Sequence, residues 1–151
     1  MRDSRMMYSD KNRGVIQNRE RARQIIDFSG IRYGNITPTD IDGFFERANE
    51  AFVFYELKFR DTEMPTGQEV ALKRLVDATR KANKKAVLFL CRHEVEDTSK
   101  DVDAAKAIVK KIYFNGEWYN GNGRTLKQIT DSFMKWAVPD FLRQTKGADS
   151  D

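Results

Sequence analysis

Four ionisable residues, Asp40, Asp42, Glu56 and Lys58, lie near the two ends of the stretch DIDGFFERANEAFVFYELKF, among Phe, Val, Tyr and Leu. An uncompensated charge buried among such side chains is costly. If a hairpin turns at Asn49, cross-strand partners have residue numbers that add up to 98, so Asp42 lies opposite Glu56 and Asp40 opposite Lys58. Because side chains alternate between faces with a period of two, the spacing predicts that all four share one face.

This arrangement suggests a particular chemistry. Directly opposed Cβ atoms in a hairpin lie about 5 Å apart, so Asp42 and Glu56 repel one another unless a positive charge lies between them. Mg²⁺ prefers oxygen ligands and is usually held by one or two carboxylates together with water and phosphate. Lys58, two residues after Glu56, would reach that water or phosphate. The pattern therefore predicts metal-assisted hydrolysis of a phosphodiester.

A second interpretation stays open at this point. The four charged residues could form the solvated face of an antiparallel hairpin, with Lys58 paired to Asp40. The aromatic residues Phe44, Phe52 and Phe54 are expected on the same face, and they favour a buried surface that the charges continue.

The elements that must position these residues follow from hydrophobic periodicity and turn residues. We expect a mixed α/β sheet with helices packed on it. The predicted elements are a helix over 15–28, the hairpin strands 41–47 and 51–59, a helix over 67–82, a strand in KKAVLFLCRHEV, two strands around NG in AKAIVKKIYFNGEWYNGNG, and a helix in TLKQITDSFMKWAV that Pro139 stops.

Each predicted helix has an expected buried side or cap. Thr66 and Glu69 have the spacing of a capping box at the start of the second helix. The residues expected on the buried sides are Ile16, Ile25, Ile26 and Phe28 in the first helix, Val70, Leu72, Leu75, Val76 and Ala78 in the second, and Leu126, Ile129, Phe133 and Trp136 in the last.

Composition excludes some kinds of site and predicts the location and organisation of the chain. The chain has 151 residues, a net charge of +4, one cysteine (Cys91) and one histidine (His93). These numbers exclude an internal disulfide and a structural zinc site, and they leave Cys91 as a buried strand thiol. We find neither a membrane span nor a secretory signal, and we expect a soluble cytoplasmic protein. The predicted organisation is one domain over 14–145, with flexible segments at 1–13 and 146–151.

The segments TDID and FYELKF resemble the Asp…Glu-x-Lys core of the PD-(D/E)XK nuclease superfamily, which includes Holliday junction resolvases, RecB-like and VRR-NUC nucleases and many restriction endonucleases. Glu20 in NRERARQII is similar to a helical glutamate of the resolvase-like members, and Gln68 in GQEVALKRLV to a glutamine that follows the lysine strand. The resemblance covers about 15–92 and implies a restriction-endonuclease-like fold, with a core of helix, three-stranded meander, helix and strand.

The resemblance also implies residue roles. Asp42 and Glu56 would bind Mg²⁺ or Mn²⁺, with Glu20 as an additional ligand or water contact. Lys58 would position or activate the water and stabilise the transition state, and Gln68 would orient Lys58 or the water. No organic cofactor is implied. The sequence departs from the family at the first motif, because Pro38 precedes Thr39 and Asp40, so Asp40 is a rival to Asp42.

Basic and aromatic residues supply candidates for nucleic-acid contact. Phosphate contacts set affinity and register without reading sequence. The candidates for DNA binding are Arg19, Arg21, Arg23, Arg32, Lys73 and Arg74. The same residues could equally form solvated helix faces. Four aromatic residues are candidates for base stacking or, alternatively, for packing: Tyr33, Trp118, Tyr119 and Trp136.

The sequence therefore predicts a metal-dependent DNA endonuclease or exonuclease, of the compact kind found in phages and mobile elements. One alternative is a non-catalytic module on a nuclease-like fold that binds DNA or protein, and another is a basic interaction domain unrelated to nucleases. The substrate form stays open among duplex, junction, flap, single strand and RNA, as does the choice between a homodimer and a monomer.

Overall fold

The computed structural model describes residues 16–140. The chain divides into two compact units, one up to Pro38 and one from Thr39 onward. The predicted flexible segments 1–13 and 146–151 lie outside the described residues. Each unit is described by itself.

The first unit contains one short helix, α1 (Arg19–Ala22), whose N-terminus is capped by the side chain of Asn18. The prediction of a helix over 15–28 was wrong in its extent. Ile25 and Ile26 are 93% and 75% exposed, so no apolar side is buried, and short helices without such packing are marginal in water.

The remainder of the first unit is irregular. Tyr33 and Ile36 form an isolated bridge around a turn that contains Gly34 at φ +63°. A positive φ of this kind suits glycine, which has no Cβ.

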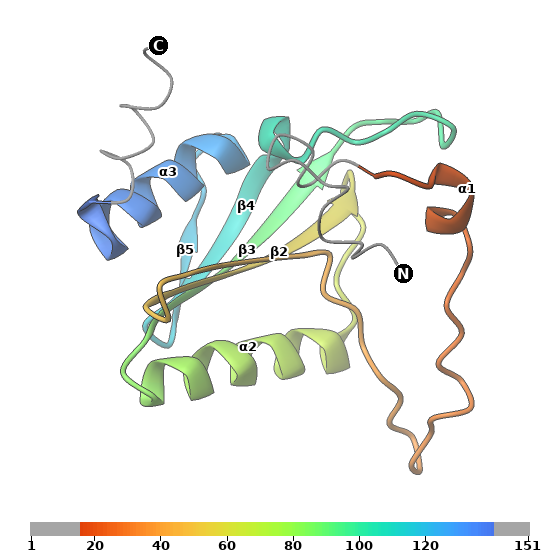
Figure 1. The fold of residues 1–151 in the computed structure, drawn as a ribbon, viewed down its shortest axis with the longest axis horizontal. Coiled ribbons are helices and arrows are strands. Elements are labelled where there is room, and N and C mark those ends of the chain that lie inside the picture. Colours follow the sequence, from red (N-terminus) through yellow and green to blue (C-terminus); the bar gives the residue numbers. More distant parts are fainter. Residues whose placement is uncertain (1–15, 141–151) are drawn as a thin grey trace, which may run out of the picture. The chain divides into compact units, whose positions relative to one another are not determined.

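The second unit is built on a five-stranded mixed sheet with the order β1-β2-β3-β4-β5 (Figure 1). β2 and β3 pair in parallel and the other neighbours are antiparallel. The strands are β1 (Gly43–Arg47), β2 (Ala51–Phe59), β3 (Lys85–His93), β4 (Ile108–Phe114) and β5 (Glu117–Asn120). The predicted mixed α/β class is confirmed.

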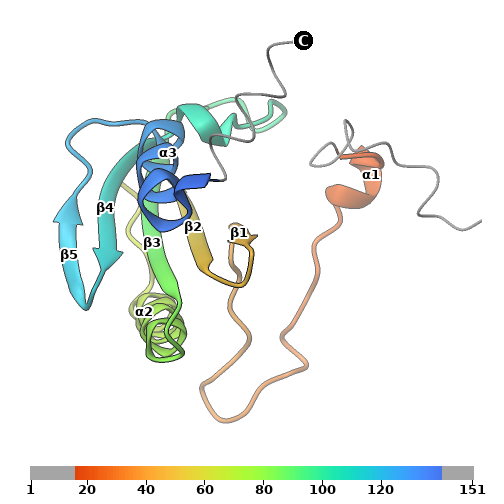
Figure 2. The same cartoon turned by 60° about the vertical axis from the view of Figure 1, so that its left-hand side comes forward.

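Two helices cover the opposite faces of this sheet, α2 (Thr66–Lys81) and α3 (Leu126–Ala137) (Figures 1 and 2). A short 3₁₀ helix, η3 (Ala104–Lys106), precedes β4. Alternation along the strands divides the core accordingly. The cluster under α3 includes Val53, Phe89, Val109, Ile129 and Phe133, and the cluster under α2 consists of Phe54, Leu72, Val76, Ala86, Leu88 and Tyr113.

The helix boundaries correct one prediction. α2 begins directly after Pro65, and no side chain caps it, so the capping box expected from Thr66 and Glu69 is absent. Pro65 takes the N-cap position, and its side chain has no oxygen that could accept a capping hydrogen bond. α3 does have a capping box, formed by Thr125 and Gln128.

Some side chains expected to be buried are not. Val70 is 38% exposed and Trp136 is 53% exposed, and Ala78 is also exposed. In α2 only a narrow stripe, Leu72 and Val76, is buried against the sheet, whereas α3 buries the predicted Leu126, Ile129 and Phe133.

The number of strands before α2 also differs from the expected family core. The described residues form a two-stranded hairpin, β1–β2, where a three-stranded meander was expected, because residues 29–42 contain only the isolated bridge. Within residues 16–140, no helix combines the length and the apolar content that crossing a membrane requires.

Candidate functional site

The β1–β2 hairpin has the predicted register. All five pairs, from Gly43–Tyr55 to Arg47–Ala51, have numbers that add up to 98. However, β1 begins at Gly43, so the predicted strand pairs of Asp42 with Glu56 and of Asp40 with Lys58 do not form. Directly before β1, the Oδ2 atom of Asp42 accepts a hydrogen bond of 2.7 Å from the backbone N–H of Leu57.

Glu56 is the buried charge among the described residues of the second unit. It is only 2% exposed, although it lies on a strand that is otherwise apolar at its buried positions. Its Oε1 atom lies 2.9 Å from the Nζ atom of Lys58 and accepts a bond of 3.1 Å from Nε2 of Gln68. Its Oε2 atom is buried and has no hydrogen-bond partner among the described residues.

Gln68 joins the first turn of α2 to this pair. Its Oε1 atom lies 3.4 Å from the Nζ atom of Lys58, and its Nε2 atom also donates to the backbone carbonyl of Asp40 at 3.2 Å. One amide therefore contacts Glu56, Lys58 and the segment before β1. Glu56, Lys58 and Gln68, which were predicted from sequence, thus lie together. Asp40 joins them through its backbone carbonyl.

The electrostatics of Glu56 follow from this burial. Desolvation raises the pKa of the Glu56 carboxyl most, and the bonds from Lys58 and Gln68 oppose that shift. Repulsion from Asp42 raises the same pKa further. The carboxylate form of Glu56 is therefore destabilised by its surroundings, and an added cation would favour it.

A cavity of about 300 Å³ adjoins Glu56 and Lys58 on the α2 side of the sheet. Its lining contains three glutamates and three lysines. The lining residues are Glu56, Lys58, Thr62, Glu63, Met64, Glu69, Leu90, Cys91, Lys110 and Lys111. Asp42 lines a different cavity, beside Tyr55 and Leu57, so the two acids face different hollows around β2.

The residues fit a divalent cation in one respect. Mg²⁺ needs only one or two protein carboxylates, with water and phosphate completing its shell. The unpartnered Oε2 atom of Glu56 supplies one such carboxylate. Asp42 lines the other cavity but lies close enough to Glu56 to raise its pKa. Among residues 16–140, no group of three or more His, Cys, Asp or Glu side chains could hold a metal.

The other predicted metal contact, Glu20, lies on α1 in the first unit. Four of the predicted DNA-binding residues belong to the same unit: Arg19, Arg21, Arg23 and Arg32, all of which are exposed. The remaining two are on α2. The Nζ atom of Lys73 lies over the Tyr113 ring at 5.3 Å, and Arg74 is exposed.

Cys91 and the stacking candidates can also be placed. Cys91 is buried, as predicted, and burial raises the pKa of its thiol to about 12. Among the aromatic candidates, Trp118 packs against Tyr113 with ring centroids 5.1 Å apart. Tyr33, Tyr119 and Trp136 are exposed.

Sequence reasoning missed the charged residues that complete the cavity lining, Glu63, Glu69, Lys110 and Lys111. A signal for the two lysines was present. The run Ile108–Val109–Lys110–Lys111–Ile112 does not alternate as a regular half-buried strand does.

Comparison of the chain with protein-family models, curated proteins and solved structures finds no match.

Proposed function

We propose that this chain is a divalent-metal-dependent nuclease of the PD-(D/E)XK type that hydrolyses DNA phosphodiester bonds on a restriction-endonuclease-like fold in the cytoplasm. The observation that carries the proposal is the buried carboxylate of Glu56, which has an unpartnered Oε2 atom and lies 2.9 Å from the ammonium group of Lys58. A buried charge that is only half satisfied costs stability, and such sites tend to be functional.

Each residue of this cluster has a role in the proposal. Glu56 and Asp42 would hold Mg²⁺ or Mn²⁺, which when bound polarises the phosphate and lowers the pKa of a water molecule. Lys58 would stabilise negative charge on the phosphate oxygens. Gln68 holds the Lys58 ammonium through its Oε1 atom and thereby fixes the direction of that charge.

Glu56→Gln tests the proposal, because it keeps the shape of the side chain and removes its charge. We expect loss of Mg²⁺- or Mn²⁺-dependent cleavage on a panel of duplex, single-stranded, flapped and four-way-junction DNA, by about 100-fold or more. Glu63→Gln is the matched control, since Glu63 lines the same cavity but is exposed. Full activity of Glu56→Gln would contradict the proposal.

Lys58→Ala separates catalysis from metal binding. We expect the rate of cleavage to fall much more than the affinity for Mn²⁺ measured by calorimetry. Equal losses of rate and affinity would assign Lys58 a structural role beside Glu56.

One observation favours a second candidate, a DNA- or protein-binding module without catalysis. The Oε1 atom of Glu56 is already paired with Lys58 and Gln68 within the chain, which is compatible with a stable internal network. DNA binding without cleavage of any substrate in either metal would favour this candidate.

A further inference from the structure

β4 contains an irregularity directly beside the cavity of Glu56 and Lys58. Leu90 of β3 pairs with Lys111, whereas the next residue, Cys91, pairs with Val109. The register of β4 therefore shifts by one residue, and Lys110 has no partner of its own in the β3–β4 ladder. This is a β-bulge, a feature that is over-represented next to active sites because it redirects side chains.

The packing of β4 confirms the change of face. Val109 and Ile112 both pack in the cluster under α3, although residues three apart in a regular strand lie on opposite faces. Tyr113 belongs to the cluster under α2. The two residues between Val109 and Ile112 absorb this change, and both Lys110 and Lys111 line the cavity on the α2 side.

The two lysines are also available to a ligand. Both are exposed, and neither side chain has a hydrogen bond or ion pair with any other described residue. Lys58, the third lysine of the cavity, is by contrast paired with Glu56. Two adjacent ammonium groups repel one another, which favours binding of an anion between or beside them.

Two of the three negative charges of the cavity come from other elements than its lysines, whereas the third, Glu56, lies on β2. Glu63 lies in the loop before α2 and Glu69 in its first turn, whereas Lys58, Lys110 and Lys111 all come from strands of the sheet. The positive charge is thus concentrated on the strands.

We propose that Lys110 and Lys111 bind backbone phosphates of a nucleic-acid strand, and so hold that strand with one phosphate at Glu56 and Lys58. The inference rests on the proposed function and deepens it, because it assigns a substrate-positioning pair that the motif of Asp42, Glu56 and Lys58 does not include. The substrate class is a polyanion with successive phosphates, as opposed to a single phosphorylated small molecule.

The test measures binding without cleavage. Fluorescence anisotropy of a short labelled duplex and of its single strand, in EDTA, gives the affinity over about 50–200 mM salt. Each phosphate contact that is lost lowers the slope of log affinity against log salt by about one. We therefore expect Lys110→Gln/Lys111→Gln to lower this slope by about two and to weaken binding about tenfold or more at low salt.

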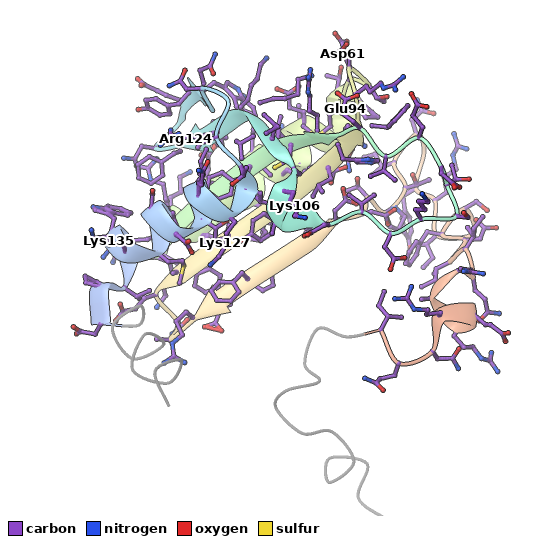
Figure 3. The ribbon with its side chains drawn as sticks, turned by 90° about the horizontal axis from the view of Figure 1, so that it is seen from above. Asp61, Glu94, Lys106, Arg124, Lys127 and Lys135 are labelled. Carbon is purple, nitrogen blue, oxygen red and sulfur yellow. The ribbon has the colours of Figure 1, made fainter. Side chains whose placement is uncertain are left out.

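A charge-matched control is available on the other side of the sheet. Lys106→Gln/Lys135→Gln removes two exposed lysines from η3 and α3, which Figure 3 shows, and we expect it to leave the slope nearly unchanged. Circular dichroism establishes that both double variants are folded. Equal losses in the two variants, or no loss in the first, would overturn the inference.

The two proposals fail in different ways. If the wild type binds DNA through these lysines but cleaves nothing, the nuclease proposal fails and the phosphate-binding pair stands. If cleavage occurs and the lysine variant has an unchanged KM and salt slope, the pair is overturned and the nuclease proposal stands. Absence of any DNA binding by the wild type would overturn the pair outright.

Discussion

The face of the sheet under α3 and the face under α2 take alternate residues from the same central strands, β2 and β3. Under α3 these residues are apolar, as Val53 and Phe89 illustrate. Under α2, β2 contributes Phe54 at one position and Glu56 and Lys58 at the next two on that face. One face therefore supplies packing along its whole length, whereas the other combines packing with a charged cavity, so stability and function should respond to mutation on different faces.

The largest expected effect on stability is on the α3 face. Phe89 is 1% exposed; its ring contacts Phe133 edge to face and Tyr55 at a tilt. Phe89→Ala should lower the free energy of unfolding by about 3–5 kcal/mol in urea titrations. Phe44→Ala is the control, because Phe44 is 55% exposed, and it should lose much less. Similar losses would contradict the assignment of the main core to the α3 face.

A smaller effect is expected in the apolar part of the α2 face. The Tyr113 hydroxyl donates to Asp77 of α2 at 2.8 Å. Tyr113→Phe should lower the free energy of unfolding by about 1–2 kcal/mol, because a hydrogen bond to a charged group is lost. Tyr119→Phe removes a similar bond to Glu117 at an exposed site, and it should change the stability very little. If both variants behave alike, the Tyr113 bond does not hold α2 to the sheet.

The smallest effect has the opposite sign and belongs to the cavity. Because the folded-state pKa of Glu56 is raised, its contribution to stability is fully present below its unfolded pKa and is lost as the pH rises through the folded value. Glu56→Gln should therefore be more stable than wild type at neutral pH, with the difference shrinking at acidic pH.

Thermal unfolding across this pH range measures the effect. Glu63→Gln should show no such pH-dependent gain, since Glu63 is exposed. A Glu56→Gln variant that is less stable than wild type at neutral pH would mean that the pair with Lys58 stabilises the fold on balance.

Much of the second unit is predictable from sequence because its signals are local. The alternation in Ala51–Phe59, the apolar run of β3 and the Asn115–Gly116 turn, in which both residues have positive φ, are such signals. The hairpin register followed from the turn position alone. Since Glu56 and Lys58 lie within β2, their shared face followed as well.

Other features depend on non-local packing and were not predictable in this way. β1 begins only at Gly43, because the side chain of Asp42 accepts the hydrogen bond of the Leu57 N–H. The short length of α1 goes with the exposure of Ile25 and Ile26 among the described residues, which periodicity cannot reveal.

The bulge in β4 has a consequence for how this chain tolerates changes in length. Lys110 has no partner on β3, so deletion of this one residue would restore regular alternation without breaking a β3–β4 residue pair. A single-codon deletion there removes one charge from the cavity and leaves the hydrophobic positions on either side in place. A single insertion or deletion in β4 can thus add or remove the charge of Lys110. In a strand without a bulge, one inserted or deleted residue would shift every following side chain to the other face.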